Sequence, residues 1–398
     1  MPVLRCFNVK YSPNLGDGLL SECLETALID CGASPASHSI DLAGRQEYGD
    51  GIVGRSAIMA ALESLPSGLR QSAIRVLLAV YGRVKWRPHY AALLDGATGV
   101  VIGGGNLLSD LDLNFPTKLG LAVKEAASRN LPIAIYACGM SDNWSKAGLK
   151  IARASFADPH VRAVFVRDAD SKRIWDELME PYTGHVAQVV RDPGLLAAAC
   201  YPMPAKVPSL RPVAGLNLIS HIALRYHAEN APSLGRLGDW YVDVAKSLIA
   251  KGYQVRAFTN GSPEDRQYAA TLRARLSALG TEEDIVFLTQ STPAELCRHI
   301  HEFDVLIAFR MHAIIAAYSL GIPSIALKWD RKLTSFMASV DQSDRVVDVV
   351  RASAHDCAEL AVRAHHEGIP ESKRNTVLAE AKADVARLYS VFASGGAA

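Results

Sequence analysis

Short apolar runs alternate with amphipathic segments along the chain, and this alternation predicts parallel β-strands separated by helices. In the first half, apolar runs bounded by turn-forming residues predict strands at 3–9, 99–102, 133–137, 163–166 and 186–190. A second series predicts strands at 213–218, 254–258, 285–287, 305–308 and 324–326. The repeated strand–helix order predicts an α/β protein with two doubly wound sheets facing each other across a cleft.

Apolar residues with a period of 3.6 predict the intervening helices. Leu19, Leu20, Cys23 and Leu24 begin such a pattern, and Gly32 ends it. Further helices are predicted at 116–129, 170–178, 239–250, 263–279 and 371–392.

A proline-rich stretch marks the strongest domain boundary. It carries Pro202, Pro204, Pro208 and Pro212. We therefore expect an N-terminal domain at 1–200, a C-terminal domain at 201–370, and a helix with a tail at 371–398. Ligands of doubly wound sheets bind beyond the carboxyl ends of the strands, so the segments that follow the strands are the candidates for chemistry.

Composition and charge narrow the class of protein. The chain has 398 residues, which favours two domains over one core. It is 49% hydrophobic and 21% charged, as in globular proteins, and its net charge of +1 argues against a nucleic-acid partner. The seven cysteines show no zinc-like spacing and predict buried thiols in a reducing compartment. No signal-like start and no apolar run of about 18 residues is present, so we expect a cytoplasmic location.

The first candidate segment, Asn14-Leu15-Gly16-Asp17-Gly18, lies between the first predicted strand and the first predicted helix. Its glycines let backbone amides approach a ligand, and the helix N-terminus behind them favours an anion. Asp17 would cap that helix or bind a sugar hydroxyl. No Gly-Lys-Ser/Thr follows, which excludes a P-loop. A tight turn with Asp17 as the helix N-cap is the plainer interpretation.

The second segment, Gly103-Gly104-Gly105-Asn106, follows the predicted strand 99–102 directly. Three glycines there cost conformational entropy unless the backbone must approach another group closely. Leu108 stands where a dinucleotide fingerprint needs its last glycine, so the segment is not such a motif.

Asp110 and Asp112 follow as an Asp-x-Asp pattern. This pattern holds a metal in some nucleotide-sugar enzymes, but it also arises by chance in any chain rich in aspartate. We expect solvated loop carboxylates here and no metal site.

The third segment is Arg167-Asp168, after the predicted strand 163–166, with Ser171 opening the next helix. An arginine at this place suits a carboxylate or a phosphate. A surface ion pair between Arg167 and Asp168 explains the pattern equally well. The Arg-Asp-Pro at 191–193 repeats the pattern, but an aspartate before proline is typical of a turn that ends a strand.

The fourth segment brings Arg310 and His312 together, directly after the predicted strand 305–308. The next strand is followed by Lys328 and Lys332, so cations would converge at one rim, with Asp330 as the one obvious acidic neighbour. A helix N-terminus disfavours the charged form of His312, whereas a bound dianion favours it. Binding of an anionic substrate would therefore favour the protonated form of His312.

Of the other histidines, we keep His221 as a candidate. It follows the predicted strand 213–218 together with Asn217 and Ser220, and so would face the same cleft.

Taken together and in this order, the segments resemble the polysaccharide pyruvyl transferase family. The shared segments are Asn14-Leu15-Gly16-Asp17, the glycines at 103–105, Arg167-Asp168 with Ser171, Asp192-Pro193, Arg310-Met311-His312-Ala313, and the stretch from Gly321-Ile322-Pro323 to Asp330 and Lys332. The resemblance implies a GT-B-like pair of Rossmann-like domains. It also implies phosphoenolpyruvate as the donor substrate, a sugar on a lipid carrier or glycan as the acceptor, and no metal or other cofactor.

The resemblance also implies roles for single residues. Arg310 and His312 fall on the family's catalytic and donor-binding segment, and Lys332 and Arg167 match its donor-binding cations. Trp329 stands where a tyrosine is expected, and it keeps a stacking surface for a sugar. Lys328 is an additional cation on the donor side. The candidates for the acceptor side and its loops are Asn14, Gly16, Asp17, Gly104, Gly105, Asn106, His221 and Trp329.

The residue types fit this chemistry independently. Phosphoenolpyruvate carries about three negative charges, which Arg310, Lys332 and Arg167 would clamp. Ketal formation needs a proton at the methylene carbon and the removal of protons from two sugar hydroxyls. A histidine exchanges protons near neutral pH, so His312 is the candidate general acid and base.

Two other functions remain open at this stage. A GT-B glycosyltransferase would grip a nucleotide-sugar diphosphate with the same cations and hold the ribose with Glu264 or Asp265. A non-catalytic sugar-binding protein would keep only the fold. The sequence also leaves open a homo-oligomeric state and peripheral contact with the inner face of the membrane. The basic, apolar stretch at 69–87 would make that contact, although a core-facing helix with a basic outer face is the simpler account.

Overall fold

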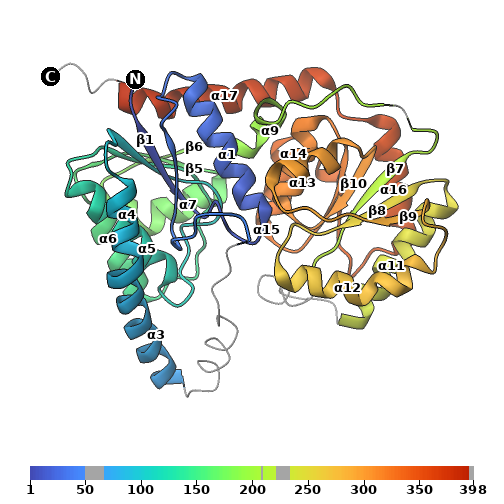
Figure 1. The fold of residues 1–398 in the computed structure, drawn as a ribbon, viewed down its shortest axis with the longest axis horizontal. Helices are drawn as coiled ribbons and strands as arrows, with labels where there is room; N and C mark the ends of the chain where they lie inside the picture. Colours follow the sequence, from blue (N-terminus) through green and yellow to red (C-terminus); the bar gives the residue numbers. More distant parts are fainter. Residues whose placement is uncertain (50–66, 208, 221–233, 394–398) are drawn as a thin grey trace. The chain divides into compact units, whose positions relative to one another are not determined.

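The chain folds into two compact units (Figure 1). The first comprises Met1–Ser12, Leu20–Pro193 and Ala381–Ala398, and the second comprises Pro13–Leu19 and Gly194–Glu380. The computed structural model describes residues 1–49, 67–207, 209–220 and 234–393.

The first unit is built on a sheet of six parallel strands in the order β2-β1-β3-β4-β5-β6. The strands are β1 (Leu4–Asn8), β2 (His38–Asp41), β3 (Gly99–Gly103), β4 (Ile133–Cys138), β5 (Val161–Val166) and β6 (Ala187–Val189). β1, β3 and β4 are buried along their whole length, as expected of parallel strands covered by helices on both faces.

Helices flank this sheet and close one hydrophobic core. They are α1 (Leu15–Asp30), α3 (Ser67–Tyr81), the π-helical turn η1 (Gly82–Trp86), α4 (Arg87–Leu93), α5 (Asn114–Ala127), α6 (Lys146–Phe156), α7 (Ala169–Leu178) and α8 (Glu180–Thr183). The first turn of α1 belongs to the second unit and the remainder to the first. Phe7, Ile102, Ile135 and Trp175 lie at the centre of this core and are fully buried.

The second unit also has six parallel strands, in the order β12-β11-β10-β7-β8-β9. The strands are β7 (Val213–Asn217), β8 (Gln254–Phe258), β9 (Ile285–Phe287), β10 (Val305–Ala308), β11 (Ser324–Leu327) and β12 (Val346–Val347). Counted within the unit, this is the Rossmann order, and the strand order reverses between β7 and β10.

Helical elements that lie wholly or partly in this unit precede, connect and follow its strands, and those before β7 are short. They are η2 (Pro193–Leu196), α9 (Ala197–Cys200), α11 (Leu234–Ala250), α12 (Pro263–Ser277), α13 (Pro293–His301), α14 (Met311–Leu320), α15 (Arg331–Ser339), η3 (Ser343–Arg345), α16 (Ala354–Glu367) and α17 (Glu371–Ala393). A second core surrounds Leu216, Tyr241, Ile307 and Ile325, which are fully buried. The fold prediction of two doubly wound, Rossmann-like sheets is therefore confirmed.

The units differ from the expected domain limits. The division falls at Pro193/Gly194 and not at 200/201, and α17 is shared, with Ala381 onward in the first unit. Pro13–Leu19, expected in the N-terminal domain, belongs to the second unit. The backbone explains this, because the Leu15 amide donates to the carbonyl of Asn260 at 2.8 Å.

Three further observations bear on the chemistry. None of the seven cysteines is part of a disulfide bond; Cys31 and Cys200 are half-buried, and the other five are buried. Within the described ranges, no helix has the length and apolarity needed to cross a bilayer. No group of three His, Cys, Asp or Glu side chains suited to a metal is found in those ranges either.

Candidate functional site

The segments that follow β7 and β10 meet at the point where the strand order of the second unit reverses. Ser220 follows β7, and Arg310 follows β10. Asp265, in the first turn of α12, joins them: its Oδ1 accepts from the Ser220 amide at 2.8 Å. In doubly wound sheets this reversal is where ligands bind, so the topology alone places these residues at the candidate site.

Arg310 is held by the carboxylate of Asp265. Its Nε donates to Asp265 Oδ2 at 3.2 Å, and its Nη2 donates to the same oxygen. Asp265 is fully buried, whereas the Arg310 side chain retains 15% exposure. Asp265 thus accepts from two of the guanidinium nitrogens, Nε and Nη2, and Nη1 takes no part in this ion pair. A buried carboxylate that fixes one side of an arginine orients the other side for an anionic ligand.

This pairing corrects two expectations. Asp330 is not the acidic neighbour that matters to Arg310, because its Oδ1 accepts from the Leu333 amide at 2.9 Å and caps α15. Asp265, suggested as a ribose ligand, is already bound to Arg310 and Ser220. The sequence could not show this, because Asp265 and Arg310 lie on different strand–helix units.

His312 lies one residue into α14, after Arg310 at the N-cap position. It is 9% exposed, and its Nδ1 lies 3.8 Å from Oδ1 of Asp17. Asp17 stands in the first turn of α1. A carboxylate at this distance favours the protonated imidazole, whereas the N-terminus of α14 disfavours it. The two effects oppose each other at the residue expected to carry protons.

Gly16 is the reason that α1 approaches so closely. A Cβ at Gly16 would lie 2.7 Å from the Cβ of His312 and 2.9 Å from its Nδ1. Real Cβ atoms do not tolerate these separations, so a glycine is required at this position. The segment Asn14–Gly18 was selected from sequence for its glycines, and the neighbour that requires Gly16 is His312.

Asn14, and not Asp17, makes the local turn contact before α1. The Asn14 Oδ1 accepts from the Gly16 amide at 3.3 Å, and the Asp17 amide donates to the Asn14 carbonyl at 3.0 Å. The simpler interpretation, with Asp17 as the N-cap, is therefore wrong. Asp17 is placed beside His312 instead.

Three further candidates follow the carboxyl end of β11: Lys328, Trp329 and Lys332. The Arg310 guanidinium carbon lies 6.0 Å from the centre of the Trp329 ring, a cation–π distance. Lys328 is exposed, and Lys332 is half-buried in the first turn of α15. The expected convergence of both lysines with Arg310 stays a prediction.

A cluster of buried amides lines the carboxyl ends of β7, β8 and β9. The Asn217 Nδ2 donates to Asn260 Oδ1 at 3.0 Å, and Gln290 Nε2 donates to the carbonyl of Thr259. All three amide side chains are at most 5% exposed. Asn217 was noted from sequence, but Asn260 and Gln290 were missed. Their signal is a polar side chain shortly after an apolar strand.

The first unit holds the other candidate residues. Gly104 and Gly105 have φ angles of 85° and 71°, which glycine adopts without strain. The Gly139 amide donates to the Gly105 carbonyl at 2.8 Å, so the loop lies against the end of β4. Asn106 Nδ2 donates to Ser141 Oγ at 3.1 Å, which anchors the end of the loop.

Arg167 lies at the carboxyl end of β5 and is buried between two carboxylates. Its Nε is 3.6 Å from Asp168, and its Nη1 is 3.6 Å from Asp192. Asp168 also caps α7, accepting from the Ser171 amide at 2.7 Å. The alternative of a surface ion pair is wrong, because the Arg167 side chain is only 6% exposed. Asp192, expected only to form a turn, is a buried partner of Arg167.

The Asp-x-Asp pair separates into two unrelated carboxylates. Asp110 is buried and accepts from the amide and hydroxyl of Ser145 at 2.9 and 2.6 Å, at the start of α6. Asp112 is exposed and lies 3.5 Å from Arg70. The expectation of solvated loop carboxylates is therefore right for Asp112 and wrong for Asp110. His221 lies outside the described residues.

Comparison with models of known protein families supports the family resemblance that these segments suggested. The model of the polysaccharide pyruvyl transferase family matches residues 14–331, which is most of the chain. The protein belongs to the polysaccharide pyruvyl transferase family. This transferase has no significant match among curated proteins.

Solved structures similar to the transferase share its fold. The UDP-GlcNAc 2-epimerase of Methanocaldococcus jannaschii, in complex with UDP-GlcNAc and UDP, has a TM-score of 0.56 and 12% identity over 99% of each chain. The Neisseria meningitidis UDP-GlcNAc 2-epimerase bound to UDP-GlcNAc gives 0.54 and 11% over 99% of this chain and 100% of its own. A UDP-forming trehalose-phosphate synthase of Burkholderia vietnamiensis gives 0.52 and 12% over 98% of each. These likenesses show a GT-B-like fold of two Rossmann-like domains.

Proposed function

We propose that this transferase moves the pyruvyl group of phosphoenolpyruvate onto a sugar of a polysaccharide or lipid-linked glycan and forms a cyclic ketal. The observation that carries the proposal is the arrangement of Arg310 and His312. Asp265 orients the arginine, and Asp17 lies beside the histidine, at the point of the sheet where ligands bind.

The reaction balances with the groups present. Two sugar hydroxyl oxygens bond to C2 of phosphoenolpyruvate, and the C2–O bond to phosphate breaks. One hydroxyl proton ends on the methylene carbon, which becomes the methyl group, and the other leaves with phosphate. We assign His312 to accept and return protons in these steps. The reaction is redox-neutral and needs no further reactant.

Electrostatics supports an anionic donor at this place. Arg310 would bind the carboxylate or phosphate through the part of its guanidinium that faces away from Asp265, and Lys332 and Lys328 would add charge. We place Trp329 as a stacking surface for the sugar, because its ring already lies 6.0 Å from the Arg310 guanidinium. Arg167 in the first unit is proposed as a further donor contact, although Asp168 and Asp192 already offset its charge.

A nucleotide-sugar glycosyltransferase is the competing proposal, since the similar solved structures include proteins bound to UDP-GlcNAc. At 11% and 12% sequence identity, these similarities show a shared fold and nothing about the substrate. The use of Asp265 by Arg310 and Ser220 argues against it as a ribose ligand.

Thermal unfolding with ligands separates the two proposals. A ligand at about a hundred times its dissociation constant stabilises the folded protein by about 2.7 kcal/mol. We expect a rise in Tm with phosphoenolpyruvate that is absent in Arg310→Ala and retained in Arg351→Ala, a change at an exposed arginine. A rise with a nucleotide sugar and none with phosphoenolpyruvate would show that the glycosyltransferase proposal is correct.

A further inference from the structure

One face of the helical stretch from α3 to η1 exposes aliphatic side chains in a row. Leu69, Val76, Val80 and Val84 are 62%, 64%, 52% and 72% exposed. Their spacings of seven, four and four residues place them on one side of a helix. We refer to these four residues as the valine stripe. A single exposed aliphatic residue is ordinary, whereas several on one face of a helix are typical of an interaction surface.

The opposite face of the same stretch accounts for its attachment to the first unit. Ile74 is buried, and Trp86 belongs to the core of the first unit, as does Tyr90 in the following helix α4. In Figure 1, α3 continues beyond α4 and away from the sheet. The valine stripe is therefore not the core-facing side of the helix. The outer face, expected from sequence to be basic, is both apolar and basic.

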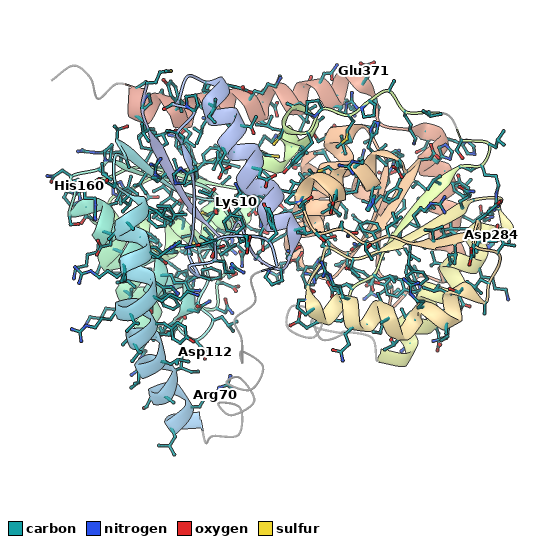
Figure 2. The ribbon with its side chains drawn as sticks, in the orientation of Figure 1. Lys10, Arg70, Asp112, His160, Asp284 and Glu371 are labelled. Atoms are coloured by element: carbon teal, nitrogen blue, oxygen red, sulfur yellow. The ribbon has the colours of Figure 1, made fainter. Side chains whose placement is uncertain are left out.

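The charges on this stretch all have one sign. Between Ser67 and Leu94 the chain carries Arg70, Arg75, Arg83, Lys85 and Arg87, and no aspartate or glutamate. Arg70 and Arg87 pair with Asp112 and Glu125, at 3.5 and 2.7 Å. Figure 2 shows Arg70 and Asp112 at the end of α3 distant from α4.

Two of these cations remain for an external partner. Within the described part of the chain, Arg75 and Arg83 form no ion pair and are exposed, whereas Lys85 is half-buried with its side chain against Gly44. A row of aliphatic side chains beside unpaired cations matches the boundary between acyl chains and anionic headgroups. A nucleic-acid partner would use the cations but would leave the aliphatic row without a function.

We propose that the valine stripe, together with the exposed cations Arg75 and Arg83 of the same helical stretch, docks this transferase on a membrane surface rich in anionic lipid. The helix would lie in the plane of the interface with the stripe among the lipids. The inference does not depend on which donor the active site uses. A lipid-linked acceptor would then be met at the surface where it resides.

Vesicle flotation with the full chain tests this directly. The probes are vesicles of phosphatidylcholine alone and of phosphatidylcholine mixed with phosphatidylglycerol, each at low and high salt. We expect binding to the anionic vesicles that weakens at high salt, and at least tenfold less binding without phosphatidylglycerol. Absence of binding to the anionic vesicles at low salt would overturn the proposal.

Matched variants locate the surface. We expect Val76→Ser/Val80→Ser/Val84→Ser to lower vesicle binding about tenfold, and Arg75→Gln/Arg83→Gln to lower it by a similar factor. The controls are Val186→Ser/Val189→Ser, at valines 61% and 44% exposed, and Arg173→Gln/Arg351→Gln, at exposed arginines. These controls should bind as the wild type does.

Folding and self-association are read in the same samples. Because the altered side chains are exposed, each variant should keep the wild-type Tm and its phosphoenolpyruvate-induced shift, so a failure of the donor proposal shows separately. Equal loss of binding in the control variants would contradict a specific surface. A different outcome is a dimer in sedimentation that the triple valine variant dissociates. If no vesicle binding is seen as well, a second copy of the chain covers the stripe and the membrane proposal is overturned.

Discussion

The Nδ1 atom of His312 lies 3.8 Å from a carboxylate oxygen of Asp17, although the two residues are separated by almost three hundred positions in sequence. Both belong to the second unit, because the first turn of α1 packs there. The distance is longer than a hydrogen bond but short enough for the carboxylate to act on the charge of the ring. The pair places a carboxylate beside the imidazole without requiring a fixed bond between these two atoms.

His312→Gln should reduce phosphoenolpyruvate-dependent phosphate release by about 10² to 10⁴, the range of general acid–base catalysis, while donor binding persists. Asp17→Asn should reduce it less, about tenfold, and move the pH–rate profile to lower pH, because the imidazolium loses its neighbouring negative charge. Calorimetry with phosphoenolpyruvate and rates across pH measure both effects. An unshifted profile in Asp17→Asn would remove Asp17 from the mechanism.

Gly16→Ala should disturb the site without unfolding the chain. The new Cβ meets the Cβ of His312 at 2.7 Å, and neither atom can rotate away, so α1 and His312 must separate. We expect at least a tenfold loss of rate. The control is Gly238→Ala in α11, where the new atom meets the end of Leu272 at 3.1 Å. Wild-type turnover in Gly16→Ala would mean that the spacing between α1 and His312 is not important.

Asp265→Asn should lower both stability and donor affinity. The change removes the charge partner of Arg310 in a buried setting, which we expect to cost about 2–4 kcal/mol of unfolding free energy. Adding Arg310→Gln should recover part of that loss, as a double-mutant cycle would measure. Glu264→Gln, an exposed neighbour in the same helical turn, serves as the control and should be neutral. Additive effects of the two changes would show that the pair does not interact.

Stability should fall as the solution becomes mildly acidic. Burial lowers the pKa of His89, His185, His299 and His365 below the ordinary histidine value. The unfolded chain therefore binds protons at a higher pH than the folded chain does, so the stabilisation is complete above about pH 6.5 and is lost as pH falls through the folded pKa values.

Thermal unfolding between about pH 7.5 and pH 5 measures this loss. His365→Gln should flatten the dependence, because it removes one of the four groups; His365 Nδ1 lies 2.7 Å from the Tyr253 hydroxyl. A Tm that rises on acidification would contradict the assignment.

The strands were predictable because buried parallel strands are continuous apolar runs. The apolar runs that became β9 and β10 were predicted with their observed limits, and so was β8, in which the polar residues Gln254 and Arg256 alternate with apolar ones. β2 and β12 were missed for a physical reason. β2 reads His-Ser-Ile-Asp, and β12 has only two residues, so neither forms an apolar run.

The candidate site was predictable as a set of segments and not as a set of contacts. The position after β10 identified Arg310 and His312, since the rule on strand ends needs only local sequence. Their partners Asp265 and Asp17 depend on how loops from different strands meet. The same limit explains Asp110, whose partner Ser145 lies beyond the next strand.

Transfer from doubly labelled phosphoenolpyruvate tests the central claim most directly. The protein is incubated with donor labelled in its pyruvyl carbons and in its phosphate, together with glycans and lipid-linked oligosaccharides from cells that make the protein. We expect the carbon label to enter the glycan fraction and the phosphate label to appear as inorganic phosphate in equal amount, and neither to occur with His312→Gln. Carbon label that never enters the glycan, in a fraction that accepts sugar from a nucleotide sugar, would contradict the account.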